Sequence, residues 1–454
     1  MDISKIIQKI KRAPLWLNVS LLTIISFIYV LYSQFQSSAL MVSRTKKVYY
    51  VDNISEAHQI IIDMFNEKYK GEIEVVPINL PFYQFTTNDR KEILTRSLRS
   101  RSDVIDVFAV DLIWIQRFAK WGSNLDTSID YSTLSHVNNK ALEICYQDGH
   151  IVAMPLFLDM GVLYYRKDIL YELPDGKEIE KRLKKSMTWD EFRELGKRFK
   201  LLGKPYPFYL FVGGDYEGMI CCFHDMLTNE ESDSMFLGNK INLNTASAVR
   251  VLRDLVDFIY KYKFTPLEVT KFDEYASYAY ANEKDAVTLR AWLGYDKQYK
   301  GLLSDTSKIR LFGIAPLPHY KHSNTSAVLG GWCLMVSKYS PRQEEALKFV
   351  KFMFDVESQK LLYEYGGYLP VNMKVYSDSA YIKRYPELLQ WLELLKWGRH
   401  RPQLSNYTRI SEIMARAFHR VLRKEISVES ALKLATTQIN EEKVILNRKL
   451  AEEK

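Results

Sequence analysis

Residues 330–341 read Gly-Gly-Trp-Cys-Leu-Met-Val-Ser-Lys-Tyr-Ser-Pro, and residues 366–370 read Gly-Gly-Tyr-Leu-Pro. Two glycines before a tryptophan at the start of a strand let the backbone approach a ligand closely. Between the two stretches, apolar residues recur at helical spacing: Ala346, Phe349, Val350, Met353 and Phe354. Ser340 followed by Pro341 and Gln343 has the pattern of a helix start, which predicts a helix that Ser340 caps. The region therefore predicts a ligand loop, a strand and an amphipathic helix.

The composition is that of a folded globular protein. The chain has 454 residues, 47% of them hydrophobic and 26% charged, which is enough for two or three domains. The net charge of +8 lies largely in residues 1–46, which hold six basic residues and one acidic residue. The remainder carries 57 basic against 54 acidic residues. No basic stripe with interleaved aromatic residues is present, so we expect no nucleic-acid partner.

The sequence gives no sign of a metal or a cofactor. Its four cysteines show no C-x-x-C spacing: Cys145, Cys221, Cys222 and Cys333. We expect them to be mostly buried thiols, with a disulfide as the alternative in an oxidising compartment. His319 and His322 lie in a loop rich in Pro, Ser and Asn. No phosphate-binding loop or dinucleotide fingerprint is present, and we expect neither a metal nor a cofactor.

The amino-terminal region contains one long apolar run. Residues 15–32 are apolar apart from four polar residues, and as a helix they would span roughly 27 Å. Four basic residues precede the run, which predicts a cytoplasmic tail at 1–14, a transmembrane helix or signal anchor at 15–33 and a linker at 34–46. The alternative is a signal peptide cleaved after Ala39. Either way, we expect the main domain to be periplasmic or extracellular.

From residue 47 onward, strand and helix patterns alternate. Residues 48–51, 73–78 and 103–110 have strand patterns, and residues 57–69 have a helical one. Such alternation indicates βαβ units on a mostly parallel sheet, and hence an α/β fold. No short repeat or low-complexity linker marks a domain boundary.

Several further blocks occur in an order known from one family: residues 103–111 with 113–114, residues 148–155, 159–168, 188–192 and 289–292, and residues 401–402 with 406–407. Together with the opening stretch, they resemble the extracellular solute-binding proteins, family 1, of bacterial ABC sugar importers, of the maltose/trehalose-binding type. Thr188 and Glu191 also form a capping box at a predicted helix start. Two departures are the missing lipoprotein cysteine and Gly294, which stands where an aromatic residue is common, with Tyr295 next to it.

The resemblance implies a two-lobed periplasmic-binding-protein fold (type II). Lobe 1 would comprise residues 47–156 plus 330–368, and lobe 2 residues 157–329 plus 369–454. The chain would cross between the lobes near 155–159, 317–329 and 368–372. A small-molecule carbohydrate, expected to be an oligosaccharide, would be held between the lobes and delivered to ABC permease subunits in the membrane. The protein would act as a monomer.

Sugars present hydroxyl groups that need polar partners and C–H faces that pack on flat aromatic rings. The resemblance and this chemistry together give ten ligand-binding candidates. They are the carboxylates Asp111 and Asp159, the donors Arg290 and Arg401, the rings Trp292, Trp332, Tyr83 and Tyr368, and the close-approach glycines Gly330 and Gly331.

Each of the main candidates also has a purely structural interpretation. Asp111 would cap the helix through Trp114, and Asp159 would satisfy a hinge amide. Arg290 would pair with a surface carboxylate such as Asp285. Trp332 would belong to the core.

Two other functions compete with solute transport. In a glycosidase, Asp111 and Asp159 would flank the scissile bond, but nothing in the sequence places one of them in an apolar pocket as an acid. A ligand sensor would report to a membrane signalling partner, because the residues before the apolar run are too few for an output domain. Product formation from labelled oligosaccharides would identify an enzyme, and a neighbouring kinase gene would indicate sensing. We expect a binding protein and no enzyme.

The length of the apolar run and the missing lipidation cysteine predict that residues 15–32 stay attached as a membrane tether. Tethering would raise the effective concentration of the binding domain near its permease. Amino-terminal sequencing of the mature protein tests this prediction. A mature chain that begins at Leu40 would show that the segment is a cleaved signal peptide.

Overall fold

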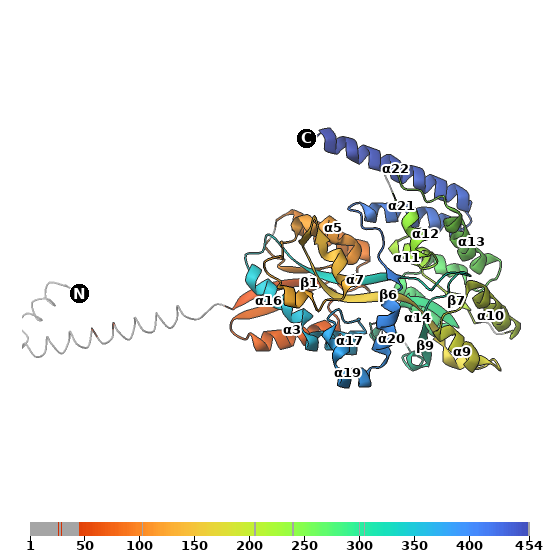
Figure 1. The fold of residues 1–454 in the computed structure, drawn as a ribbon, viewed down its shortest axis with the longest axis horizontal. Coiled ribbons are helices and arrows are strands. Elements are labelled where there is room, and N and C mark those ends of the chain that lie inside the picture. Colours follow the sequence, from red (N-terminus) through yellow and green to blue (C-terminus); the bar gives the residue numbers. More distant parts are fainter. Residues whose placement is uncertain are drawn as a thin grey trace, which may run out of the picture.

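The computed structural model describes residues 45–101, 103–203, 206–237, 240–298, 300–303 and 305–452, together with residues 26 and 29. The described chain forms two α/β lobes side by side, with strands passing between them (Figure 1). Apart from residues 26 and 29, the predicted transmembrane segment lies outside the described residues. Among the residues that are described, no helix combines the length and the apolar character needed to cross a membrane.

One mixed sheet runs through both lobes. Its described strands follow the order β2-β1-β3-β10-β6-β8-β7, with β11 paired to β10 and β9 paired to β6. We call the body around β1, β2 and β3 the first lobe and the body around β7, β8 and β9 the second. The strand bounds are β1 Lys46–Asp52, β2 Ile73–Asn79, β3 Val107–Asp111, β6 Met154–Arg166, β7 Tyr209–Leu210, β8 Thr288–Trp292, β9 Phe312–Ala315, β10 Ala327–Val336 and β11 Gly398–Arg399.

Strands β6 and β10 join the two lobes. They pair antiparallel, and each also pairs outward: β10 with β3 in the first lobe and β6 with β8 and β9 in the second. All ten residues of β10 are buried, as are all residues of β6 except Asp159. A strand that is buried on both faces has a nearly continuous apolar sequence, and β6 and β10 both have one. A third passage lies beside them, because Leu369 forms a bridge with Leu158.

The chain before β6 builds most of the first lobe. Its helices are α3 Glu56–Lys68, α4 Thr87–Arg99, η1 Leu112–Trp114, α5 Ile115–Phe118, η2 Ala119–Trp121, α6 Tyr131–Leu134, α7 Asn139–Leu142 and η3 Glu143–Cys145, followed by the hairpin β4 Tyr146–Gln147 and β5 His150–Ile151. The chain returns to this lobe after β10. The ring of Phe349 lies 5.1 Å from that of Tyr50 and 5.2 Å from that of Phe65, so the returning helix completes the core.

The chain between β6 and β10 builds most of the second lobe. Its helices are α8 Lys167–Leu170, α9 Gly176–Lys184, α10 Trp189–Leu201, α11 Glu217–Asp225, α12 Asn229–Ser234, α13 Ala246–Tyr260, η4 Leu267–Lys271, α14 Glu274–Glu283, α15 Tyr295–Gln298, η5 Lys300–Leu302 and η6 Ile309–Leu311. The helices after β10 are α16 Gln343–Phe354, α17 Val356–Gly366, α18 Lys374–Ser377, α19 Ser379–Arg384, α20 Glu387–Leu395, α21 Tyr407–Leu422 and α22 Val428–Glu452. Of these, α21 covers the second lobe, since the ring of Phe418 lies 4.8 Å from that of Phe223.

The predicted cap of the helix after the Gly-Gly-Trp strand is wrong. Helix α16 begins at Gln343, and its N-cap residue Arg342 makes no side-chain cap. The Ser340 hydroxyl instead donates to Asp106, a fully buried carboxylate that also accepts from the backbone of Tyr49. The same hydroxyl accepts from the backbone of Arg342 at 3.0 Å, just before the helix begins, and its bond to Asp106 helps to satisfy a buried carboxylate. The capping box of Thr188 and Glu191 is confirmed at the start of α10.

The glycine at 331 is set by strand packing. Its φ is +136°, and an added Cβ would lie 2.4 Å from the carbonyl oxygen of Phe157 on β6. We predict that Gly331→Ala lowers the free energy of unfolding by about 2 kcal/mol or more, through backbone strain and overlap with β6. Denaturant unfolding measures this. Gly301→Ala is the control, because an added Cβ there meets no atom within 4 Å and the expected change is within about 0.5 kcal/mol. Equal stabilities of the two variants would contradict the prediction.

Candidate functional site

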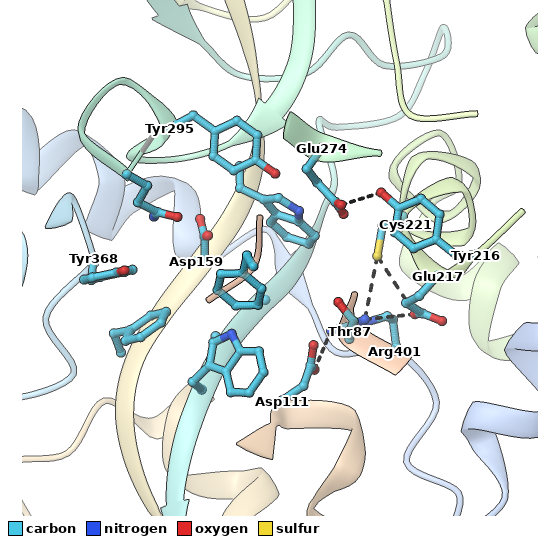
Figure 2. A pocket seen from close by; sticks show the side chains of 18 residues that line it. Thr87, Asp111, Asp159, Tyr216, Glu217, Cys221, Glu274, Tyr295, Tyr368 and Arg401 are labelled. Carbon is cyan, nitrogen blue, oxygen red and sulfur yellow. Dashed lines mark hydrogen bonds and ion pairs between the residues drawn. The ribbon is translucent and has the colours of Figure 1, made fainter. Parts of the chain in front are cut away.

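A cavity of about 100 Å³ lies where β6 and β10 cross between the lobes (Figure 2). It is lined from both lobes, by Asp111 at the end of β3 and by Trp292 at the end of β8. Side chains at the ends of strands in open α/β sheets commonly meet in such a crevice. The site is therefore built by the sheet that joins the lobes.

Strand register brings the predicted residues together. Trp332 on β10 is opposite Asp111 on one side and Phe157 on the other. Gly331, one residue before Trp332 on β10, is opposite Leu158. Gly330, two residues before Trp332, is opposite Asp159. Segments that are far apart in sequence thus place two carboxylates and an indole around one cavity.

The two glycines line the cavity, but each also makes room for a protein group. An added Cβ on Gly330 would lie 2.8 Å from the ring of Trp292, and one on Gly331 would meet the backbone of Phe157. Glycine at 330 therefore lets the Trp292 indole lie against β10. The sequence led us to expect that the two glycines leave space for a ligand, but protein groups take up part of that space.

Trp332 belongs to the core and to the cavity wall at once. It is 8% exposed, and its ring lies 5.6 Å from that of Phe82 and 5.5 Å from that of Trp114. The Arg90 guanidinium lies 4.1 Å from its ring centroid and donates to Asp52 at 2.9 Å. This packing fixes the indole from behind, so the edge that lines the cavity is held in one orientation.

Arg290 does not line the cavity. It is 1% exposed, and its Nε donates to Asp225 at 2.7 Å, while Asp225 also accepts from the Val328 backbone. Its guanidinium lies 4.3 Å from the ring centroid of Trp292. The expected surface pairing with Asp285 is also absent from the described contacts, where Asp285 pairs with Arg166 instead. Its bond to Asp225 and its contact with the indole show that Arg290 supports Trp292 from within the lobe.

Arg401 joins the two walls of the cavity. Its Nη2 donates to Asp111 at 3.0 Å, and its Nη1 donates to Glu217 at 2.8 Å. The side chain is only 5% exposed, and Ser411 and Tyr407 also donate to Glu217. Asp111 also accepts from the backbone of Ile113 and so caps η1, as its structural interpretation predicted. It therefore caps this helix and lines the cavity. Two carboxylates therefore share one guanidinium across the site.

Two other carboxylates line the cavity with fewer partners. Asp159 is partly exposed and accepts from the backbone of Met160 at 2.7 Å. Burial raises its pKa well above the ordinary value of an aspartate. Glu274, at the start of α14, accepts from the Tyr216 hydroxyl, and burial raises its pKa too. Burial also raises the pKa of Glu217, against the lowering effect of Arg401. The cavity thus holds carboxyl groups whose charge is poorly compensated.

Of the ten predicted residues, eight line the cavity: Asp111, Asp159, Trp292, Gly330, Gly331, Trp332, Tyr368 and Arg401. Tyr368 stacks on Phe157, with ring centroids 4.1 Å apart. Tyr83 lies outside the cavity and is 58% exposed, because the neighbouring Phe82 occupies the inward position of that loop. The roles of these residues in binding stay predictions.

Sequence reasoning missed several lining residues: Phe82, Thr87, Phe157, Tyr216, Glu217, Gly218, Cys221, Glu274, Tyr295 and Gln298. Glu217 lies in a glycine-rich run, residues 213–218, and that run was the available signal. Glu274 stands in a surface-like helix and had no such signal. In the part of the chain that is described, no group of His, Cys, Asp and Glu is arranged to hold a metal ion.

Fold and site define a two-lobed solute-binding protein, and comparison with known families agrees. Residues 60–390 match the model of the bacterial extracellular solute-binding protein family, and the chain belongs to that family. The predicted membership and the two-lobed α/β fold are thereby confirmed. The members and relatives compared here are binding proteins.

Individual relatives show the same likeness. The chain is 25% identical to a probable ABC transporter-binding protein of Deinococcus radiodurans, over 77% of this chain and 83% of that protein. It is 24% identical to an arabinooligosaccharide-binding protein of Halalkalibacterium halodurans, over 70% and 68% of the respective chains. Its fold is similar to that of maltose-bound MalE3 of T. maritima, with a TM-score of 0.74, 26% identity and coverage of 87% and 99%.

The raised pKa of Asp159 predicts a pH dependence of stability. The folded state keeps this proton to higher pH than the unfolded chain does, where an aspartate titrates near about 3.9. Ionisation of Asp159 therefore costs the folded state more than the unfolded chain. As pH rises from the unfolded-state pKa through the folded-state pKa, the contribution of Asp159 to the free energy of unfolding falls. We expect Asp159→Asn to raise Tm relative to the unaltered chain, by an increment that grows as pH rises toward neutrality. Melting curves over this range measure it, and parallel curves for the two proteins would contradict it.

Proposed function

We propose that this chain is the substrate-binding component of an ABC importer and captures a carbohydrate, expected to be an oligosaccharide, between its two lobes. The observation that carries the proposal is the cavity at the crossing of β6 and β10. There, aromatic rings and carboxylates from both lobes line one cavity. Carboxylates accept hydrogen bonds from sugar hydroxyls, and rings pack on the C–H faces of the sugar.

The relatives support this ligand class. One is named for the binding of arabinooligosaccharides, and the structure that resembles this chain at 26% identity holds maltose. The cavity also suits more than one sugar unit. A second hollow of about 340 Å³ shares Phe82, Thr87, Tyr216 and Glu274 with it, so the space between the lobes continues beyond the first cavity.

Lobe closure would accompany binding. We infer that residues 47–156 plus 330–368 move as one lobe and residues 157–329 plus 369–454 as the other, with bending at the three passages. Contacts across the opening support a closed arrangement: Arg401 bonds Asp111, and Lys91 on α4 donates to Glu412 on α21 at 3.1 Å. A ligand drives such a closure only by binding the closed form better than the open one.

Delivery to a permease follows from the family rather than from a surface of this chain. The partners we propose are the membrane subunits of an ABC importer, with the binding protein acting as a monomer. The main domain would lie outside the cytoplasmic membrane, held there by residues 15–33 if that segment is not cleaved. No catalytic step is part of this proposal.

Calorimetry with purified chain and a panel of oligosaccharides, including maltotriose and arabinotriose, tests the function. We predict that Trp292→Ala weakens binding by about 2 kcal/mol or more, roughly thirtyfold, because a stacking ring is removed. Trp332→Ala should weaken binding and also cost about 3–5 kcal/mol of stability, because its ring packs in the core.

Trp397→Ala serves as the control, since that ring is 43% exposed and lies outside the cavity. It should leave both affinity and Tm nearly unchanged. Unaltered affinity in a folded Trp292→Ala variant would remove that ring from the site. Failure of every saccharide to bind the unaltered chain would contradict the proposed function itself.

A further inference from the structure

The charge of the cavity is opposite to that of the chain. The chain as a whole has 63 basic and 55 acidic residues. The cavity is nevertheless lined by four carboxylates, Asp111, Asp159, Glu217 and Glu274, and its lining holds Arg401 as its one basic side chain among the described residues. A neutral solute does not by itself require such an excess, because neutral amides and hydroxyl groups can also bind its hydroxyls.

The single guanidinium is already engaged. Arg401 donates to Asp111 and to Glu217, at 3.0 Å and 2.8 Å. Asp159 and Glu274 form no ion pair with any described residue that the contacts record; their hydrogen bonds come from the Met160 backbone and the Tyr216 hydroxyl. Both residues are partly exposed, and removal of their carboxylates from bulk water raises the pKa of both.

The basic residues behind the cavity walls do not supply the missing charge. Arg290 pairs with Asp225 at 2.7 Å, and Arg90 pairs with Asp52 at 2.9 Å. Each guanidinium lies behind a tryptophan and is neutralised by its own aspartate. These pairs support the rings of the cavity. Arg290 acts on Asp159 and Glu274 only through its field, which lowers the pKa of both, and the raising effect of burial is larger.

The adjoining hollow is also lined by acidic side chains. It shares Glu274 with the cavity and adds Asp215 and Asp273 to the lining, with no Lys or Arg among its described lining residues. A path of one charge sign raises the local concentration of an oppositely charged solute and speeds its association. The acidic character therefore extends from the cavity toward its opening.

The rings beside Asp159 suit a cation as well as a sugar. Figure 2 shows its carboxylate in the region bordered by Tyr295 and Tyr368, and both rings line the cavity with Trp292. The faces of such rings attract ammonium groups, and the attraction grows when water is excluded. A carboxylate between aromatic rings is a suitable site for one positively charged group on a ring-shaped solute.

Resting on the proposed function, we propose that the solute is a saccharide with a protonated amine, a basic amino sugar unit, and that Asp159 and Glu274 select it. The ammonium group takes the place of the missing basic side chain. The remaining hydroxyls and ring faces of the solute meet Asp111, Arg401 and the tryptophans, as they would in a neutral sugar.

Calorimetry on the full chain near neutral pH tests this with three probes of equal length: the glucosamine trimer with free amines, its fully N-acetylated form, and maltotriose. We expect the amine-bearing trimer to bind about tenfold or more tightly than the acetylated trimer, because bonds to a charged group are the stronger ones. Its affinity should also fall with added salt, whereas that of the neutral probes should not. Asp159→Asn and Glu274→Gln should each remove most of the tenfold preference.

Asp63→Asn, on the exposed face of α3, is the matched control for loss of one negative charge and should keep the preference. Equal affinities for the three trimers, or tighter binding of a neutral one, would overturn the inference and leave the proposed function in place. Binding of none of the three would overturn the inference and count against saccharide binding as well. If a variant fails to fold, the comparison of the probes on the unaltered chain still decides the question.

Discussion

The antiparallel pairing of β6 with β10 is the constraint on which the rest of the structure depends. It joins the two lobes in one sheet and sets Gly330 opposite Asp159. It also requires glycine at 331, where φ is +136° and the carbonyl of Phe157 fills the place of a side chain. Because each strand pairs outward into a different lobe, a small bend at the crossing would change the distance between the cavity walls without unpacking either core.

The cavity walls are held by charged pairs placed one layer behind them. Arg90 with Asp52 lies behind Trp332, and Arg290 with Asp225 lies behind Trp292. Buried pairs of this kind add little net stability, but they fix orientation. Both guanidiniums stay out of the cavity lining, where Arg401 is the basic side chain among the described residues.

The sequence predicted the sheet segments and most of the cavity because local signals agreed with the global fold there. Local patterns marked β1, β2 and β10, the family resemblance marked the strand within residues 159–168, and the order of the blocks placed Asp111 and Trp332 near each other. What failed depended on contacts between distant segments. Ser340 bonds Asp106 and the backbone of Arg342, and the helix begins only at Gln343. Strand β3 begins at Val107 rather than 103.

The direction in which a side chain points was the other source of error. Arg290 lies inside β8 and faces Asp225 in the lobe, and Tyr83 faces solvent while its neighbour Phe82 faces inward. The sequence of an irregular loop does not indicate which of its side chains point inward and which point to solvent. Glu274 entered the site only because α14 begins at the cavity, which no pattern within residues 274–283 indicates.

A crystal structure of the chain with a bound saccharide tests the central claim most directly, namely that the crossing of β6 and β10 builds the binding site. The account predicts density for the sugar between Trp292 and Trp332, within hydrogen-bond distance of Asp159 and with the ion pair of Arg401 and Asp111 intact. Density at any other place on the protein, with the cavity empty, would contradict it.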